Sequence, residues 1–363
     1  MRGLLVALLL VVVCAIPCAA EELPVLKVSY VFTTHHTPLI VAAMRGETFK
    51  DQSVYLKTVA PKERYELVRN GKPVALLDFV VAKSGAETAT LFAQNHVDLA
   101  MASVTAIMAG VDKGTGMKVV APMQTEGMAL VAPKGSSIAS WDDLVAKAKA
   151  GSEPLKIGYH SPTSAPKIVF EGALKQAGIA VTENPNDANA KILLVDLKET
   201  TNMLPALAAG QVEAVVGPSP FPEMAVAKGV GQVVADLKDL PPTGFWRDYP
   251  CCVTVAGDKC IAERPEAVQA FVDLVIASNI WCDAHKGEAG ALTAEWIGMP
   301  PEAGKSSSLS FLSSFSESWM RNTGNYLAVL DQMDKFTGQL KGKTLDDVKP
   351  ILFDMRFIEK TKP

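Results

Sequence analysis

The chain has 363 residues, 48% of them hydrophobic, and its 35 basic and 39 acidic residues give a formal net charge of −4. This length suits two domains of ordinary size. The sequence has no arginine-rich run and no basic stripe, which excludes nucleic acid and anionic membrane surfaces as expected partners.

The N-terminus has the pattern of a secretory signal peptide. Arg2 precedes an apolar run over residues 4–13, and Pro17 is followed by small residues that end at Ala20. We expect cleavage after Ala20, which removes residues 1–20 and leaves a periplasmic or otherwise extracytoplasmic protein. No later stretch is expected to be long and apolar enough to cross a bilayer, which takes about 20 residues.

Strands and helices alternate in the first part of the mature chain, and Ser84 is expected to cap one of the helices. The patterns predict strands at 26–32, 54–59, 75–79, 98–102 and 117–122, and helices at 38–45, 84–94 and 105–113. Alternation of this kind predicts right-handed β-α-β units and a largely parallel sheet.

A second alternating set follows residue 128, with Ser140 as the expected cap of its first helix. The patterns predict helices at 141–150, 166–176, 202–209 and 222–228, and strands at 155–159, 191–196 and 214–217. After a strand at 252–257 the chain is expected to be helical, at 265–281, 287–297, 308–315, 325–336 and 345–351.

These elements predict an α/β protein with two open-sheet lobes joined by a two-strand hinge. We expect residues 21–127 and 252–363 to form a discontinuous first lobe that includes the C-terminal helices, and residues 128–251 to form the second lobe. Strands at 128–131 and 252–255 are expected to cross between the lobes. Ligands of open α/β sheets lie beyond the carboxyl ends of the strands, so a cleft between the lobes is the predicted site.

Four predicted strands end in polar turns that lead into helices, where free backbone N–H groups and side-chain donors gather. The ligand-binding candidates in these turns are Thr33, Thr34, His35, His36 and Thr37; Ser103 and Thr105; His160, Ser161, Thr163 and Ser164; and Ser219. Helix capping explains the hydroxyl residues equally well. An anionic or strongly hydrogen-bonding ligand is favoured because helix N-termini attract negative charge.

Four more ligand-binding candidates lie near the predicted crossings. Gln124 follows the strand at 117–122, whereas Phe221 and Trp246 are expected to form an apolar wall, and Cys251 lies beside the second crossing. Glu126 would repel an anionic ligand unless it pairs with a cation such as Arg247.

The two adjacent histidines and the cysteines leave alternatives open. Adjacent residues on a strand point to opposite faces, so at most one of His35 and His36 is expected to reach the cleft unless the backbone turns. Of the six cysteines, two lie in the predicted signal peptide. The other four, Cys251, Cys252, Cys260 and Cys282, form either disulfides in one of three pairings or buried free thiols.

Four segments, at 32–46, 97–103, 210–216 and 264–268, resemble the type II periplasmic solute-binding proteins of ABC importers. The resemblance covers the mature chain and is strongest to the nitrate, sulfonate and taurine branch, which includes binders of the thiamine pyrimidine precursor. It implies a monomer with two α/β lobes that close over a small-molecule ligand and deliver it to a membrane permease.

Three other functions stay open. One is a pyrimidine-precursor binder or enzyme on the same fold, although the sequence lacks the hydrolase, zinc-protease and phosphate-loop motifs. Another is a sensor that presents its closed form to a receptor. The third is a metal receptor that uses His35, His36 and His160, with Glu126. We expect no cofactor and no catalytic residue.

Overall fold

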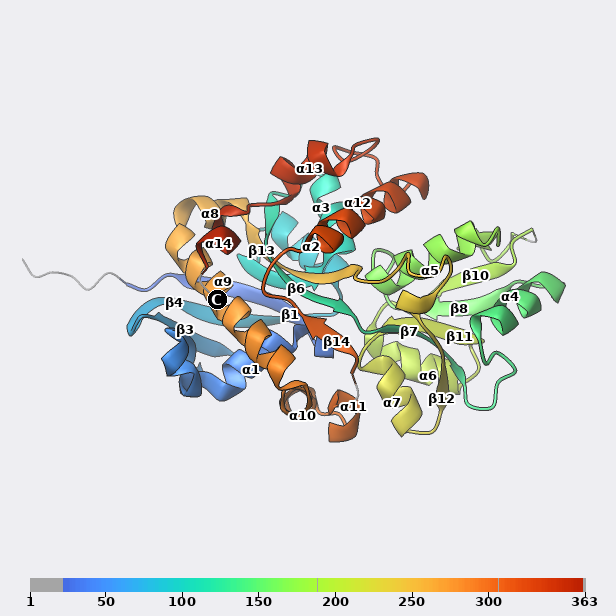
Figure 1. Ribbon diagram of the computed structural model, residues 1–363, viewed down its shortest axis with the longest axis horizontal. Helices are drawn as coiled ribbons and strands as arrows, with labels where there is room; N and C mark the ends of the chain where they lie inside the picture. The colour runs from blue at the N-terminus through green and yellow to red at the C-terminus, as the bar shows by residue number, and fades with distance from the viewer. Residues whose placement is uncertain (1–21, 188, 306, 362–363) are drawn as a thin grey trace, which may run out of the picture.

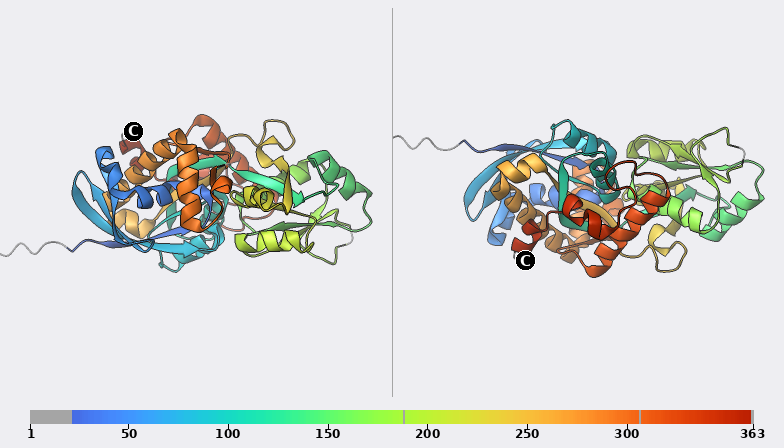
Figure 2. Two further views of the ribbon diagram at one scale, coloured as in Figure 1. Left: turned by 90° about the horizontal axis from the view of Figure 1, so that it is seen from below. Right: turned by 90° about the horizontal axis from the view of Figure 1, so that it is seen from above.

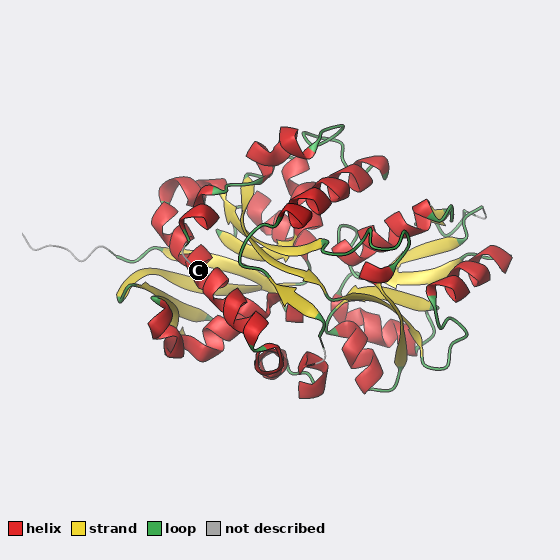
Figure 3. Ribbon diagram, in the orientation of Figure 1, coloured by secondary structure: helices red, strands yellow, loops and turns green. Residues whose placement is uncertain are grey.

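The computed structural model describes residues 22–187, 189–305 and 307–361. The signal-peptide prediction lies outside these residues. Two β-sheets lie side by side along the long axis of the molecule, each packed against helices (Figure 1, Figure 3). The predicted fold class, α/β with two open-sheet lobes, is confirmed.

The first sheet has the strand order β14-β6-β13-β5-β1-β4-β3-β2. Its strands are β1 (Val25–Val31), β2 (Val54–Ala60), β3 (Arg64–Arg69), β4 (Lys72–Ala82), β5 (Leu99–Ser103), β6 (Met117–Glu126), β13 (Pro250–Gly257) and β14 (Leu309–Phe311). Strand β1 pairs parallel with β4 and β5, but every other pairing is antiparallel. The prediction of a largely parallel sheet is therefore wrong here, because β2, β3 and β4 form hairpins and β13 returns from the other lobe.

The second sheet has the order β12-β7-β11-β8-β10-β9. Its strands are β7 (Met128–Pro133), β8 (Leu155–Tyr159), β9 (Val181–Thr182), β10 (Ile192–Asp196), β11 (Ala214–Pro218) and β12 (Gly231–Asp236). Strands β8 to β11 pair in parallel, whereas β7 runs antiparallel to both of its neighbours.

Helices cover both sheets (Figure 2). Those before β7 and after β13 are η1 (Thr34–His36), α1 (Thr37–Arg45), η2 (Gly46–Gln52), α2 (Gly85–Ala93), α3 (Val104–Asp112), α8 (Asp258–Glu263), α9 (Pro265–Ala284), α10 (Lys286–Ile297), α11 (Pro301–Lys305), α12 (Glu317–Gln332), α13 (Leu345–Leu352) and α14 (Arg356–Lys360). Those between β7 and β13 are α4 (Trp141–Ala150), α5 (Ala165–Gln176), η3 (Thr200–Asn202), α6 (Met203–Ala208), α7 (Phe221–Ala227) and η4 (Leu237–Asp239). Ser84 and Ser140 cap α2 and α4 as predicted.

Helix α9 corrects one expectation. By length and composition it could cross a membrane, but 67% of its most apolar window is buried inside the fold. It packs against α1 and β6 as a core helix of the first lobe. Its apolar character therefore reflects burial inside the protein.

The segment at 308–315 is not the helix that the sequence predicts. Leu309 and Phe311 are buried on either side of the half-buried Ser310, and the three residues form β14 on the edge of β6. This period-two burial is typical of a strand. Helix α12 begins at Glu317, eight residues before the predicted start, because Ser316 accepts a hydrogen bond from the Trp319 backbone and caps it.

The chain crosses between the sheets twice. Gly127 lies between β6 and β7, and residues 237–249 lead from the second sheet back to β13. Gly127 has a φ of +69°. Strand β13 begins at Pro250, within the first sheet. The lobe boundaries at 127/128 and 251/252 stay a prediction.

Candidate functional site

The turn after β1 contains both adjacent histidines, and both are buried. Thr33 caps η1 by accepting a hydrogen bond from the His35 backbone N–H. His36 Nδ1 accepts a hydrogen bond of 2.8 Å from the Val31 backbone N–H, so its imidazole closes the turn. Burial, and then the neighbouring His35, lower the pKa of His36 to about 3. His36 therefore has a structural role here.

His35 connects the hinge to two cysteines. Its Nε2 donates a hydrogen bond of 2.9 Å to the Gly127 carbonyl, which can only accept. Its Nδ1 lies 3.2 Å from Cys251 Sγ and 3.9 Å from Cys252 Sγ, and the two sulfurs are 4.0 Å apart. All four cysteines of the described chain are free and buried, which answers the question of disulfides.

The three neighbouring groups perturb one another's titration. The contact with Cys252 lowers the pKa of Cys251 most; burial opposes this, and His35 lowers that pKa further. The contact with Cys251, followed by burial, holds the pKa of Cys252 well above its usual range. Burial would lower the pKa of His35, but Cys251 and the Gly127 carbonyl raise it overall. Contacts with Cys252 and His35 thus make Cys251 the more acidic of the two thiols.

The turn after β8 faces this group from the second lobe. Thr105 Oγ1 donates a hydrogen bond of 2.6 Å to the Thr163 carbonyl and lies 2.7 Å from Ser103 Oγ. Ser164 Oγ donates to the Ser161 carbonyl at 2.8 Å and makes no capping bond. The Thr105 bond joins the start of α3, which follows β5, to the turn after β8, and β5 and β8 lie in different sheets.

His160 is buried in the same turn, and its Nδ1 has no hydrogen-bond partner in the described chain. Burial, and then His35, lower the pKa of His160 to about 4. His35 in the first lobe therefore lies close enough to His160 in the second lobe to lower its pKa. His160 is therefore a neutral imidazole at ordinary pH.

Ser219 connects the turn after β11 to the first lobe. Thr33 Oγ1 donates a hydrogen bond of 2.6 Å to the Ser219 carbonyl, and the Ser219 N–H donates one of 2.8 Å to the Gly127 carbonyl. Ser219 Oγ donates to Glu223 at 2.6 Å, and Pro220 instead of Ser219 occupies the N-cap of α7. Burial raises the pKa of Glu223.

Gln124 lies opposite Cys252 in the ladder between β6 and β13. It is fully buried, and neither atom of its amide group makes a hydrogen bond of good geometry among the described residues, although the amide lies near enough to Cys251 to lower the pKa of that thiol. Ser161 Oγ and Thr163 Oγ1 are unpartnered as well. Buried polar atoms without partners are rare in folded proteins and require an explanation.

We define the interlobe cluster as the group of predicted residues that the structure gathers between the two lobes. Its members are Thr33, His35, Ser103, Thr105, Gln124, His160, Ser161, Thr163, Ser164, Ser219 and Cys251, together with Cys252, which the sequence did not predict.

Other predicted residues lie elsewhere. Thr34 accepts a hydrogen bond from Ser307, and Thr37 contacts Thr293 of α10 at 2.7 Å. Trp246 is buried in the core and donates its indole N–H to a backbone carbonyl.

Phe221 lies in the second-lobe core and borders a groove of about 480 Å³ between the lobes. Thr33 and Ser219 border the same groove. Glu126 does pair with a cation, which is Lys238 at 3.0 Å, whereas Arg247 pairs with Asp239.

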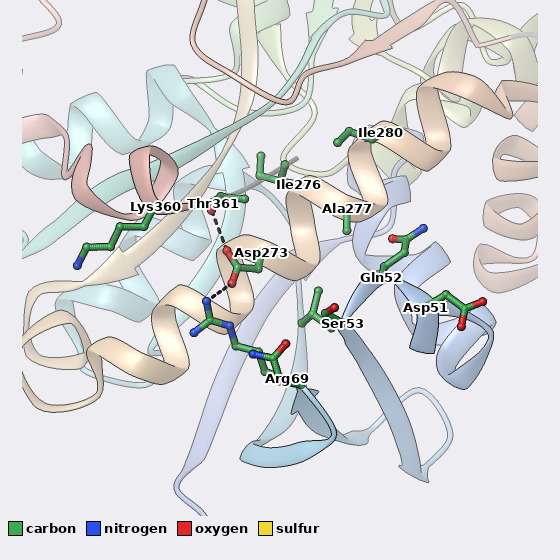
Figure 4. Close-up of a pocket in the computed structure, with 12 residues that line it drawn as sticks. Asp51, Gln52, Ser53, Arg69, Asp273, Ile276, Ala277, Ile280, Lys360 and Thr361 are labelled. Atoms are coloured by element: carbon green, nitrogen blue, oxygen red, sulfur yellow. Dashed lines mark hydrogen bonds and ion pairs between the residues drawn. The ribbon is translucent and has the colours of Figure 1, made fainter.

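A larger cavity of about 680 Å³ lies within the first lobe, beside α9 (Figure 4). Arg69 and Asp273 form an ion pair of 2.6 Å there, and Thr361 Oγ1 donates a hydrogen bond of 2.8 Å to Asp273 (Figure 4). Because Arg69 and Asp273 pair with each other and no predicted ligand residue lines the cavity, it does not define the site.

Comparisons with solved structures define the class of fold. The ligand-binding component of an ABC-type import system from Staphylococcus aureus, determined with zinc bound, has a TM-score of 0.69 and 15% identity over 93% of this chain and 99% of its own. The alkanesulfonate-binding protein of Xanthomonas axonopodis, bound to MOPS, has a TM-score of 0.66 and 14% identity over 92% and 99%. The nitrate-binding protein of Synechocystis has a TM-score of 0.64 and 14% identity over 91% and 85%. The fold is that of the periplasmic binding proteins.

Residues 19–298 match the NMT1-like family, and the chain belongs to that family. It is also 37% identical over 113 residues to an uncharacterized protein of Methanocaldococcus jannaschii, covering 31% of this chain and 78% of that protein. The resemblance predicted from the sequence is thereby confirmed.

Proposed function

We propose that the protein is an extracytoplasmic solute-binding protein, which captures one small solute between its lobes and delivers it to an ABC importer. The observation that carries this proposal is the set of unpartnered buried polar atoms on Gln124, His160, Ser161 and Thr163. They lie where turns of both lobes meet, and a bound solute would supply the missing partners. In this proposal the protein acts as a monomer and binds its ligand without converting it chemically.

The donors around the interlobe cluster favour a small organic anion or a sulfonate-like solute. The cluster offers hydroxyls, an amide and imidazoles, and the N-terminal ends of α3 and α5 border it. Helix N-termini of this length attract oxygen-rich anions. Similarity to alkanesulfonate- and nitrate-binding proteins supports this ligand class.

The test begins with native mass spectrometry of the protein from a periplasmic extract, followed by denaturation and identification of any released solute. A thermal-shift screen of sulfonates and carboxylates then ranks ligands for the metal-free protein. His160→Ala and Gln124→Ala are expected to weaken binding of the best ligand at least about tenfold, since each removes about 1.4 kcal/mol or more of hydrogen bonding.

Ser278→Ala is the matched control. Ser278 Oγ is also buried without a partner, but it belongs to the core helix α9. Binding that is equally strong in the His160, Gln124 and Ser278 variants would contradict the site, and a protein that captures no solute in either experiment would contradict the proposed function.

A further inference from the structure

The interlobe cluster contains a compact set of metal-ligand atoms. His35 Nδ1, Cys251 Sγ and Cys252 Sγ all lie within 4.8 Å of one another, and all three residues are buried. The histidine lies in η1, directly after β1, whereas the cysteines are the second and third residues of β13, so neighbouring parts of the first lobe hold the set. The three histidines considered from the sequence do not form such a group among the described residues; the cysteines take the place of His36 and His160.

The distances match those of ligands that share one metal ion. Zinc binds sulfur at about 2.3 Å and nitrogen at about 2.0–2.1 Å, so tetrahedral ligand atoms lie about 3.5–3.8 Å apart. The observed separations are 3.2 and 3.9 Å from nitrogen to sulfur, and 4.0 Å from sulfur to sulfur. An ion between these atoms needs movements of only a few tenths of an ångström.

The hydrogen bond between His35 Nε2 and the Gly127 carbonyl leaves Nδ1 as the nitrogen that can bind a metal ion. The Gly127 carbonyl accepts from Nε2, which places the proton of a neutral imidazole there and leaves the Nδ1 lone pair facing the sulfurs. A backbone carbonyl in this position is the usual outer partner of a metal-binding histidine. The Gly127 carbonyl therefore keeps Nε2 as the protonated nitrogen, and a metal ion would displace any proton from Nδ1.

The contact between the Gly127 carbonyl and His35 Nε2 also depends on glycine at position 127. A Cβ on Gly127 would lie 3.1 Å from His35 Nε2 and would overlap Leu309. The absence of a side chain allows the hinge backbone to reach the imidazole. The amide oxygen of Gln124, buried and unpartnered opposite Cys252, is a further donor beside the set.

We propose that His35, Cys251 and Cys252 form a binding site for one thiophilic d¹⁰ metal ion, Zn²⁺ or Cu⁺, within the interlobe cluster. Two sulfur donors and one imidazole suit these ions, whereas hard cations prefer oxygen. Binding requires both sulfurs as thiolates, so any thiol proton still present leaves to solvent as the metal–sulfur bonds form. The inference deepens the proposed receptor function and rests on it for the role of the cleft.

The test uses the mature chain, reduced and stripped of metal. Zn²⁺ is titrated in competition with a chromogenic chelator, and Cu⁺ is titrated anaerobically with a Cu⁺-specific chelator. We expect one equivalent of at least one ion to bind. Cys251→Ser and Cys252→Ser are expected to weaken binding by about 100-fold or more, because even the loss of an outer partner costs 10–100-fold.

Cys260→Ser and Cys282→Ser are the matched controls. Both residues are buried free cysteines outside the ligand set, so their variants should bind the ion as the wild type does. Thermal unfolding of each metal-free variant shows whether it has folded. Should a variant not fold, Co²⁺ added to the wild type supplies the answer, since thiolate ligation produces a charge-transfer absorption band in the near ultraviolet.

Absence of stoichiometric Zn²⁺ and Cu⁺ binding by the wild type would overturn the metal site. So would binding that survives the double variant Cys251→Ser/Cys252→Ser, or a Co²⁺ complex without the charge-transfer band. The thermal-shift screen of organic solutes on metal-free protein reports separately on the proposed receptor function.

Discussion

Gly127 combines three roles in a single residue. It joins β6 to β7 with a φ of +69°, and its carbonyl accepts hydrogen bonds from His35 Nε2 and from the Ser219 N–H. A side chain would strain the backbone and overlap Leu309. We expect Gly127→Ala to lower the free energy of unfolding by about 2–4 kcal/mol, measured by urea denaturation.

Gly135→Ala separates the cost of backbone strain from the cost of the overlap with Leu309. Gly135 has a φ of +78°, but a Cβ there would meet nothing within 4 Å, so this variant carries the backbone cost alone, about 1 kcal/mol. If the two variants lost equal stability, the overlap at Gly127 would have no energetic weight.

The buried histidines predict how stability changes with pH. The folded-state pKa of His160 is about 4 and that of His36 about 3, whereas an unfolded histidine titrates near 6.5. Below pH 6.5 the unfolded chain binds protons that the folded chain does not, so stability falls as the pH decreases. Each histidine contributes a slope of about 1.4 kcal/mol per pH unit between pH 6 and its folded pKa.

Urea denaturation of wild type and His160→Gln at several values between pH 7 and pH 5 measures this slope. In His160→Gln, the slope of the free energy of unfolding against pH should fall by about 1.4 kcal/mol per pH unit. His96 is exposed, and His96→Gln serves as the control. Parallel curves for wild type and His160→Gln would contradict a neutral buried His160.

The sequence predicted most residues of the interlobe cluster but not how they are arranged. The strand-to-helix turns predicted His35, His160, Thr105 and Ser219, because residues that follow parallel strands lie at the carboxyl edge of a sheet. The contact between His35 and Cys251 spans 216 positions and depends on the strand order, which periodicity does not reveal. Cys252 was missed for the same reason.

At the scale of elements, the apolar patterning of the sequence predicted β1 and β8 well, because both strands are short apolar runs. Strand β3 was missed, although Asn70 and Gly71 carried a clear hairpin signal. Both have positive φ, at 51° and 75°, as a tight turn between antiparallel strands requires. The segment at 308–315 was mistaken for a helix because a three-residue strand offers too few residues to show its period.

Helix α5 contains a buried charge that ties it to the neighbouring strand. Lys167 has a fully buried side chain and pairs with Glu171 at 2.6 Å and Glu183 at 2.8 Å. Lys167→Met removes the cation that pairs with Glu171 and leaves Glu183 with Lys335 alone, and solvent near Glu183 moderates the cost. We expect a loss of about 3 kcal/mol in the free energy of unfolding, measured with urea.

Lys335→Met provides the comparison, because Lys335 pairs with the same Glu183 at 3.5 Å but is partly exposed. Its loss should cost less than about 1 kcal/mol. Similar losses for the two variants would show that burial of Lys167 adds nothing to the strength of its pairing.

At the scale of the whole molecule, two hydrogen bonds hold the lobes in contact through their strand-end turns. Thr33 Oγ1 donates to the Ser219 carbonyl, and Thr105 Oγ1 donates to the Thr163 carbonyl, both at 2.6 Å. Each bond joins a turn of one sheet to a turn of the other. The structure is therefore a closed form, and opening about the two crossings would expose the interlobe cluster.

The double variant Thr33→Val/Thr105→Val should shift the free protein toward an open form. Two hydrogen bonds of about 1 kcal/mol each change the closed-to-open ratio by roughly 30-fold. Small-angle X-ray scattering should then give a larger radius of gyration than for the wild type. Thr37→Val is the matched control, because Thr37 bonds Thr293 within the first lobe and its loss leaves the lobe contacts intact. An unchanged radius in the double variant would mean that packing outside these turns, such as that of α12 against α5, holds the molecule closed.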